Sequence, residues 1–346
     1  MIYFDSDYMV GAHPEVMERL VETNLLHTPG YGRDCFTAEA RNTILRACSL
    51  PDSAEVYLLE GGTQANAVVI DRLLDHNDGV LAADTAHINV HEAGAIESNG
   101  HKILTIPNRD GKLTAEDIER YVSDFYRDDT HHYMVRPAMV YISYSTELGT
   151  LYSLSELKAI RAVCSRYSMP LYVDGARLAY ALASPKGDVT LPQLAELADV
   201  FYIGGTKCGA LFGEAVVTRR PELLPRFVSL IKLHGATLAK GRLLGVQFST
   251  LFATDLYLRI GAHGINMAMR LREGFISRGY TPYIDSPTNQ QFFLLPNEVI
   301  EKLREIASFE LWGAPGKKAT PVRFVTDWST TNEDVDTLIS ALLPAN

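Results

Sequence analysis

Val200-Phe201-Tyr202-Ile203-Gly204-Gly205-Thr206-Lys207 is the stretch on which the fold prediction rests. It is a short apolar run that ends in two glycines and delivers a lysine, which is typical of a buried strand followed by a tight turn. A second run, Leu171-Tyr172-Val173-Asp174-Gly175-Ala176-Arg177, has the same form and delivers an aspartate. Ligands of α/β proteins bind at the carboxyl ends of the sheet strands. We therefore expect the Lys207 amine and the Asp174 carboxylate to face one pocket.

An amine and an acid in one pocket are the two groups that pyridoxal 5′-phosphate (PLP) requires. A lysine forms a Schiff base with the aldehyde of this cofactor, and an acid pairs with its pyridine nitrogen. Burial of Lys207 would lower its pKa and favour this chemistry. The alternatives are a surface lysine in a turn and, for Asp174, a helix cap. Arg177 would lie near the pyridine 3′-oxygen or the substrate, or else simply pair with Asp174.

The composition is that of a globular enzyme. The chain has 346 residues, 47% hydrophobic and 21% charged, and this length favours two domains. The net charge of −10, without a Lys/Arg cluster, argues against nucleic-acid binding. The four cysteines are scattered without a CxxC pair, which indicates neither a zinc site nor disulfides and favours a reducing compartment. We expect no signal peptide, no membrane span and a cytoplasmic protein.

Apolar runs alternate with helix-like segments through most of the chain. Strands are expected at 56–59, 79–83, 102–106, 139–143 and 214–217, besides the two runs quoted above. This alternation predicts an α/β fold with a mostly parallel sheet and helices on both faces. A long helix is expected over Leu238–Gly261, and then a helix at 266–278, strands at 291–295 and 322–325 and a helix from Asn332.

Two domains follow from this pattern. We expect a large PLP-binding domain of residues 1–250, whose first ~15 residues form an N-terminal arm. Boundaries read from a sequence are good to a few residues. We expect a small α+β domain of residues 251–346.

The turn Gly61-Gly62-Thr63-Gln64 lies between an expected strand and an expected helix. Its glycines allow backbone N–H groups to approach an anion, and the positive end of the helix adds to this attraction. Gly62, Thr63 and Gln64 are therefore candidates for holding a phosphate, with an ordinary helix cap as the alternative. The turn matches neither the GxGxxG nor the Walker pattern, which disfavours a nucleotide site.

Histidines provide candidates for stacking and for proton transfer. His87 follows an expected strand, and its ring would stack on a flat cofactor, with His91 and Glu92 close behind it. The spacing of His87 and His91 also suits a metal, but the HExxH pattern is absent and we expect no metal site. His132, in the pair His131-His132 ahead of the strand at 139–143, is either a catalytic base or part of a solvated loop.

Basic residues in the last third of the chain are candidate ligands for anions. Arg323 lies in an expected strand and would clamp a substrate carboxylate through two hydrogen bonds, or else lie on the rim as an ordinary charge. Lys240 and Arg242 would reach a phosphate, including one of a neighbouring subunit, or else lie on a solvated helix face.

These segments together resemble the fold type I PLP-dependent enzymes, and among them the L-threonine aldolase/β-eliminating lyase family. Each matching run alone is weak, but they span nearly the whole chain in family order, and the ordered set is specific. The runs are Phe4-Asp5-Ser6-Asp7, Gly30-Tyr31-Gly32, Gly61-Gly62-Thr63-Gln64-Ala65-Asn66, Ala86-His87-Ile88-Asn89 with Glu92-Ala93-Gly94, Ser145-Thr146-Glu147-Leu148-Gly149-Thr150, Val173-Asp174-Gly175-Ala176-Arg177-Leu178, Gly204-Gly205-Thr206-Lys207 and Gly213-Glu214-Ala215-Val216-Val217.

The resemblance implies roles for the matching residues. The cofactor would be held by Gly62, Thr63, Gln64, His87, Asp174, Arg177, Lys207 and, across an interface of a homotetramer, Arg242. The substrate would be bound by Ser6, His91, Arg177 and Arg323, and the catalytic groups would be Lys207, Asp174, His87 and His132. The sequence departs from the family at His91, where many members have a tyrosine, at the histidine pair and at Cys208.

The implied activity is cleavage of L-threonine, L-allo-threonine and related β-hydroxy-α-amino acids to glycine and an aldehyde. A base, from His132, His87 or His91, would take the β-hydroxyl proton. Two alternatives use the same scaffold, namely an aldolase for phenylserine-type substrates and a β-eliminating lyase. A third is a binding protein that keeps the fold without the chemistry. A nicotinamide dehydrogenase is disfavoured because the dinucleotide-binding loop is absent.

Overall fold

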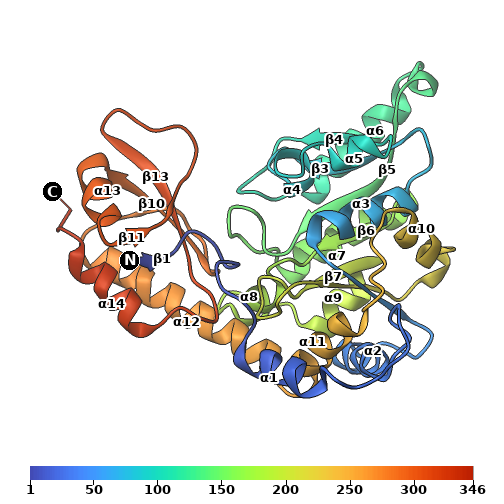
Figure 1. Cartoon of the computed structure of the whole chain (residues 1–346). Helices are drawn as coiled ribbons and strands as arrows, with labels where there is room; N and C mark the ends of the chain where they lie inside the picture. Colours follow the sequence, from blue (N-terminus) through green and yellow to red (C-terminus); the bar gives the residue numbers. More distant parts are fainter. Residues whose placement is uncertain (346) are drawn as a thin grey trace.

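A seven-stranded sheet forms the centre of the structure, a computed structural model that describes residues 1–345 (Figure 1). The strand order is β2-β8-β7-β6-β5-β3-β4. Strands β4, β3, β5, β6 and β7 pair in parallel, whereas β8 runs antiparallel to β7 and β2. The strands are β2 (Glu55–Leu59), β3 (Asp78–Ala83), β4 (Lys102–Ile106), β5 (Arg136–Ser143), β6 (Leu171–Asp174), β7 (Val200–Gly204) and β8 (Glu214–Thr218).

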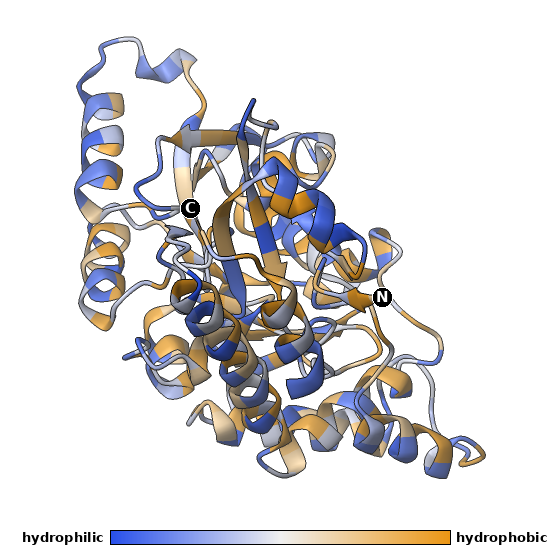
Figure 2. Cartoon of the chain, turned by 90° about the vertical axis from the view of Figure 1, so that its left-hand side faces the viewer, coloured by the Kyte–Doolittle hydropathy of each residue, from blue (hydrophilic) through white to orange (hydrophobic). Residues whose placement is uncertain are grey.

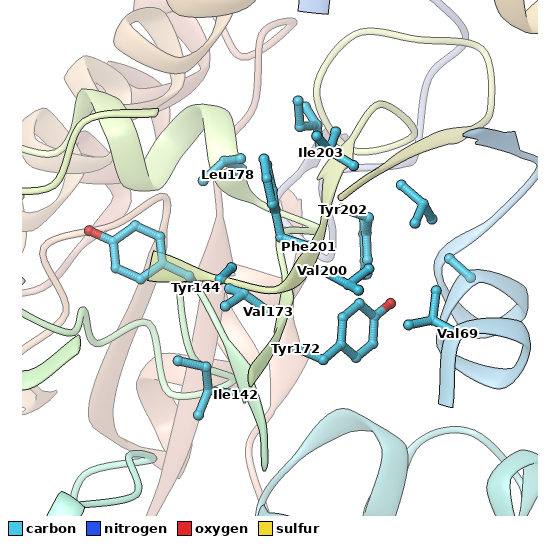
Figure 3. Packing of buried hydrophobic residues seen from close by; sticks show 14 of the residues in the cluster. Val69, Ile142, Tyr144, Tyr172, Val173, Leu178, Val200, Phe201, Tyr202 and Ile203 are labelled. Atoms are coloured by element: carbon cyan, nitrogen blue, oxygen red, sulfur yellow. The ribbon is translucent and has the colours of Figure 1, made fainter. Parts of the chain in front are cut away.

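The strands are continuous apolar runs because helices cover both faces of the sheet. Every residue of β3, β7 and β8 is buried, as expected for a largely parallel sheet. Figure 3 shows side chains of β5, β6 and β7 packed between α3, which carries Val69, and α8, which carries Leu178. In Figure 2 the central strands are mostly apolar and the helices turn their polar sides outward. The predicted fold class and strand positions are confirmed.

Helices alternate with these strands along the chain. Two of the predicted helix starts carry the expected caps: Thr114 accepts from the backbone of Asp117, and Ser153 forms a capping box with Glu156. The helices of this part are α1 (Pro14–Thr23), α2 (Cys35–Ala47), α3 (Gly62–Leu73), α4 (His87–Val90), α5 (Ala95–Ser98), α6 (Ala115–Arg127), α7 (Leu154–Arg166), α8 (Leu178–Ala183), α9 (Leu191–Leu197), α10 (Phe227–Leu233) and α11 (Arg242–Ala253).

A second, smaller sheet has its own hydrophobic core. Its strand order is β12-β13-β10-β9, and all its pairs are antiparallel. The strands predicted at 291–295 and 322–325 and the helix predicted from Asn332 are confirmed as β10, β13 and α14, whereas the helix predicted at 266–278 is only the second half of α12. The sequence analysis missed β9, α13, β11 and β12. The elements are α12 (Leu256–Ser277), β9 (Pro282–Ile284), β10 (Gln290–Pro296), α13 (Asn297–Arg304), β11 (Ala307–Ser308), β12 (Glu310–Leu311), β13 (Ala319–Val325) and α14 (Asn332–Ala341).

Helix α12 connects the two cores. Ile260 and Ile265 pack into the larger core, whereas Leu271 and Phe275 pack into the smaller one, and Figure 1 shows α12 running from one part to the other. The predicted boundary at residue 250 lies in α11, ahead of this change of core. A division into two domains at that residue stays a prediction.

The single helix predicted over Leu238–Gly261 is wrong. The chain instead forms α11 and then α12, with the break at Thr254 and Asp255, where Thr254 has an extended backbone and its hydroxyl accepts from the N–H of Leu256. Threonine and aspartate compete for backbone hydrogen bonds in this way, which favours helix ends over helix interiors. The apolar pattern continues across the break and hides it in the sequence.

The N-terminal segment crosses from the small part to the large one. β1 (Ile2–Tyr3) pairs in parallel with β11, and Phe4 is buried in the smaller core. Asp7, a few residues later, pairs with Arg177 beside the main sheet. Among residues 1–345, no helix combines the length and the apolar character needed to cross a membrane.

Candidate active site

Lys207 and Asp174 line one cavity of about 280 Å³ at the carboxyl ends of two neighbouring strands. β6 ends at Asp174, and the turn after β7 delivers Lys207. The two turns touch, because the N–H of Gly204 donates to the carbonyl of Gly175 at 2.9 Å. A Cβ on Gly204 would lie 2.2 Å from the carbonyl oxygen of Ala176, so the approach requires glycine. The convergence predicted from the two sequence runs is present.

The carboxylate of Asp174 receives four hydrogen bonds. Tyr202 Oη and the N–H of Ala176 donate to Oδ1 at 2.5 and 3.0 Å. Tyr141 Oη and Asn66 Nδ2 donate to Oδ2 at 2.7 and 3.1 Å. A carboxylate offers about four acceptor positions, and all of them are used here.

Asp174 is held in its charged form by these neighbours. Burial by itself would raise its pKa, but His87 and the hydroxyls of Tyr202 and Tyr141 lower it below its usual value. The site therefore presents a permanent negative charge beneath the cavity, which suits a ring nitrogen that must stay protonated.

His87 is fixed by a second chain of hydrogen bonds. Its Nδ1 lies 2.7 Å from Glu92 Oε1, which also accepts from Asn66 Nδ2 at 2.7 Å. Because that oxygen is an acceptor, Nδ1 carries the hydrogen and Nε2 is left as the free basic nitrogen. Asn66 Nδ2 also donates to Asp174, so Asn66 links Glu92, the partner of the histidine, to Asp174. Tyr172 Oη donates to Asn66 Oδ1 at 2.9 Å. The arrangement has the form of a base and a group that orients it.

Ser143 and Glu147 line the cavity at the carboxyl end of β5. Ser143 Oγ donates to Glu147 Oε1 at 2.6 Å, and the backbone N–H of His87 donates to the same oxygen at 3.0 Å. Burial raises the pKa of Glu147, although these hydrogen bonds oppose the effect. This carboxyl therefore keeps a proton to a higher pH than an exposed glutamate.

Lys207 has a lowered pKa because it is buried and lies near Arg177, while Asp7, Asp174 and Glu214 act in the opposite direction. A lowered pKa supplies more of the neutral amine that can attack a carbonyl. The backbone of the lysine is held by Tyr180, whose hydroxyl donates to the Lys207 carbonyl at 2.7 Å.

Glu214 is a buried carboxyl beside the lysine. It accepts from Thr206 Oγ1 at 2.8 Å and from the N–H of Gly205 at 3.0 Å. Burial raises its pKa to about 8 in spite of these bonds. Both Glu214 and Thr206 line the Lys207 cavity, so one carboxyl group of the cavity titrates at about pH 8.

The turn before α3 forms another wall of the cavity. Gly62 and Thr63 line it. The N-cap of α3 is Gly61, which forms no side-chain cap, so backbone donors are left at the helix start. A Cβ on Gly62 would lie 3.0 Å from the hydroxyl of Tyr202, so a side chain there would crowd the site. Gln64 is directed elsewhere, because its Nε2 donates to the carbonyl of His234 at 3.1 Å.

Arg177 lines the cavity, but its guanidinium is already engaged. Nε and Nη2 donate to the two carboxylate oxygens of Asp7 at 2.7 and 3.0 Å, and Asn289 Nδ2 donates to Asp7 at 2.9 Å. Burial lowers the pKa of Arg177, whereas the ion pair with Asp7 raises it, and the net result is a raised pKa. Arg177 therefore places a positive charge at the cavity through a fixed pair, rather than as a free clamp.

This set of groups fits PLP. A flat aromatic ring with a protonated nitrogen needs the anion that Asp174 provides, a phosphate needs the uncapped start of α3, and an aldehyde needs the amine of Lys207. Because all four acceptor positions of Asp174 are taken, a ring N–H must share or replace one of the present donors.

Comparison with known proteins agrees with this chemistry. The sequence model of the beta-eliminating lyase family matches residues 4–285. The chain belongs to the beta-eliminating lyase family. A low-specificity L-threonine aldolase from Pseudomonas aeruginosa is 31% identical over 96% of this chain and 94% of its own length. The structure of a Leishmania major threonine aldolase is 38% identical and covers 98% of both chains with a TM-score of 0.94.

More distant members of the fold also superpose. A structure of SPT that holds PLP as its internal aldimine is 16% identical, covers 98% of this chain and 86% of its own, and has a TM-score of 0.68. At this identity the likeness concerns the fold, which is the fold type I arrangement expected from the sequence.

Three residues predicted to bind the substrate, Arg323, His91 and Ser6, do not line the cavity. Arg323 bonds Gln290 and Glu310, and His91 lies beside this pair, with its ring centroid 5.6 Å from that of His87. Ser6 lines a different cavity of about 470 Å³, and its buried hydroxyl has no partner within residues 1–345. Their predicted roles in binding substrate stay predictions.

His132, predicted as a catalytic base, does not line the cavity of its own chain, and its catalytic role stays a prediction. His132 lies in a 3-10 turn (His131–Tyr133) that precedes β5, so it sits at the amino end of that strand. The cavity is at the carboxyl end of β5, where Ser143 and Glu147 lie. Figure 1 shows the connection between α6 and β5 pointing away from the small sheet.

Arg242 does not line the cavity of its own chain either. It donates to the carbonyls of Thr23 and Leu26, and its guanidinium lies 5.4 Å from the ring centroid of Phe36. Its expected contact with the phosphate of a neighbouring subunit stays a prediction. In the part of the chain that the structure describes, no three His, Cys, Asp or Glu side chains are grouped as ligands for a metal ion.

The sequence interpretation missed several groups of this site. Tyr141 and Tyr202 stand two residues before the ends of β5 and β7. Because side chains two residues apart in a strand lie on the same face, the sequence could have predicted that both tyrosines lie near the strand ends that carry the site. Glu214 was not available in this way, because it reaches the lysine only through the pairing of β8 with β7. Asn66, Asp7 and Glu147 depend on contacts between distant segments.

Proposed function

We propose that this chain is a PLP-dependent aldolase that cleaves L-threonine, L-allo-threonine and related β-hydroxy-α-amino acids to glycine and an aldehyde. The observation that carries the proposal is the presence of Lys207 and Asp174 in one cavity of a beta-eliminating lyase chain. The names of the P. aeruginosa and L. major relatives, both threonine aldolases, support the substrate class.

The cofactor would be held by residues from four strand ends. Lys207 would bind its aldehyde, Asp174 its ring nitrogen, and Gly62 and Thr63 its phosphate, with His87 stacked on the ring. When bound, PLP supplies an electron sink for the carbanion that forms when the bond between Cα and Cβ of the substrate breaks. The charge of Asp174 keeps the ring nitrogen protonated and so maintains that sink.

The substrate would be oriented by the arginines. Arg323 and Ser6 would hold its carboxylate, and this contact decides which bond at Cα stands perpendicular to the ring. Arg177, which lines the cavity, is already paired with Asp7. Side chains from the small sheet therefore select the reaction, whereas side chains from the main sheet supply the chemistry.

The proton of the β-hydroxyl would go to His87 Nε2, directly or through one water. Glu92 holds the hydrogen on Nδ1, so that Nε2 is the basic atom. Glycine then forms when Cα takes up a proton inside the cavity, where the Lys207 amine is the available donor. General-base assistance of this kind contributes about 10²–10⁴-fold to the rate.

The experiment that tests the proposal is a product assay. Purified protein reconstituted with PLP is incubated with L-threonine, and glycine and acetaldehyde are quantified. The proposal predicts the two products in equal amounts. The family name favours a second candidate, a β-eliminating lyase, which would give pyruvate and ammonia from a suitable substrate and no glycine.

A homo-oligomer is part of the proposal, because residues 8–31 expose several large apolar side chains, one of which lines the cavity. Tyr8 lines the cavity and is itself 54% exposed. The others include Met9, Val10, Met17, Val21, Leu25, Leu26 and Tyr31. Clustered apolar exposure of this kind marks association surfaces. Analytical ultracentrifugation would show a tetramer or dimer if this is correct. The cytoplasmic location stays a prediction.

A further inference from the structure

Arg323 is a buried arginine whose hydrogen-bonding capacity is only partly used. Its side chain is 11% exposed. Nη1 donates to Gln290 Oε1 at 2.8 Å, and Nη2 pairs with the carboxylate of Glu310. Nε is buried and has no partner among the residues that the structure describes. A buried donor without a partner is unfavourable, so a ligand that accepts from Nε would gain from binding there.

Arg177 shows what a completed pair looks like in the same molecule. Its Nε and Nη2 donate to the two oxygens of Asp7 at 2.7 and 3.0 Å, which is the two-point geometry that guanidinium and carboxylate prefer. In Arg323, Nη2 donates to Glu310, whereas Nε has no partner among the described residues. Glu310 therefore occupies one half of a position that a carboxylate would fill completely.

Glu310 is able to leave this position. It belongs to β12, a two-residue strand at the edge of the small sheet, directly opposite Arg323 on β13. Its side chain is 41% exposed, so water can take over the solvation of the carboxylate when it swings out. Trp312, whose ring centroid lies 5.0 Å from the guanidinium carbon, would stay in place beside Arg323.

The pair of Arg323 and Glu310 lies close enough to His91 for both charges to influence its pKa, and His91 in turn lies beside a residue of the cavity. His91 links the two places, since its ring is 5.6 Å from that of His87, which lines the cavity. Burial lowers the pKa of His91 first, and His87 and Arg323 add to this, whereas Glu310 acts in the opposite direction. A ligand bound to Arg323 would therefore reach toward His91 and His87.

We propose that Glu310 is a placeholder for the substrate carboxylate, which neutralises Arg323 while no substrate is bound and gives up Nη2 when the α-carboxylate arrives at Nε and Nη2. This inference rests on the proposed function, because it assumes that Arg323 binds the substrate carboxylate. Glu310 then lowers the affinity for every amino acid that binds through its carboxylate, including the product glycine, and promotes its release.

The test is a titration of the PLP-reconstituted protein with glycine, followed through the visible absorbance of the cofactor. Glu310→Gln keeps the size of the side chain and removes the competing charge. We expect its Kd for glycine to be about two- to five-fold lower than that of the wild type, the range set by a partly exposed ion pair. Glu301→Gln, an exposed glutamate on α13, is the matched control and should leave Kd unchanged. A Kd that is unchanged or higher in Glu310→Gln overturns the inference, because Glu310 would then only orient Arg323.

A second arm separates this inference from the proposed function. Arg323→Gln should weaken glycine binding, and adding Glu310→Gln to that variant should then have no further effect, because the two residues act on one another. A reconstituted wild type without a cofactor band overturns the proposed function and this inference with it. A band that responds to glycine equally in all of these proteins overturns this inference alone. The shift of the thermal midpoint with glycine gives the same comparison without the cofactor spectrum.

Discussion

The hydroxyl of Tyr202 lies 2.5 Å from Oδ1 of Asp174 and donates a hydrogen bond to it. The two residues come from neighbouring strands, β7 and β6, and both side chains are buried. Hydrogen bonds to a buried carboxylate are worth more than those between neutral groups, because the charge has lost its water. Tyr202 therefore helps to keep Asp174 ionised under the cavity.

Tyr202→Phe should destabilise the protein without cofactor by about 1.5–3 kcal/mol at neutral pH, because it removes a bond to a charged buried group. The measurement is urea denaturation. Tyr144→Phe is the matched control, since the Tyr144 hydroxyl is also buried but has no partner within the described residues. That control should cost nothing. Equal losses for the two variants would mean that the hydroxyl does not stabilise Asp174.

Glu214→Gln should alter the pH dependence of stability in the protein without cofactor. Folding raises the pKa of Glu214 from 4.5 to about 8, so the native state holds a proton that the unfolded chain has released in that range. The resulting cost grows as the pH rises from about 5 to about 8, and then stays constant. The variant should therefore gain stability over the wild type across this interval, in denaturation curves taken at several pH values. Glu18→Gln, at an exposed position, should show no such trend.

The two histidine candidates should behave differently. His87→Ala should lower kcat for L-threonine by about 10²–10⁴-fold, because it removes the proposed proton acceptor. His132→Ala should retain nearly full activity, because His132 lies at the amino end of β5, away from the cavity. Glycine production under saturating substrate gives both values. A loss in His132→Ala as large as in His87→Ala would show that the base comes from the turn before β5, by way of another subunit.

The fold and the main pair of the site were predictable because they depend on local pattern. The runs that end at Asp174 and Gly204 are apolar, short and closed by glycine, and parallel strands bring their carboxyl ends to one edge. The same rule could have placed His132 outside the cavity of its own chain, because a residue that precedes a strand lies at the opposite edge from one that follows it.

The rest of the site depends on pairings that the sequence does not specify. Five of the seven strands of the large sheet lie between Asp7 and Arg177 in the sequence, and the two residues meet only because of the path that the N-terminal segment takes. Glu310 meets Arg323 through the register of β12 and β13. The break between α11 and α12 was missed because Thr254 and Asp255 interrupt the helix without interrupting the apolar pattern.

The central claim, that the Lys207 amine and the Asp174 carboxylate serve one bound PLP, is tested most directly by borohydride reduction of the reconstituted protein followed by peptide mapping. The account predicts that reduction removes the visible band and attaches the pyridoxyl group to the peptide that contains Lys207. It also predicts that Lys207→Ala shows neither the band nor the label. A label on another lysine, or an unchanged band in Lys207→Ala, would contradict it.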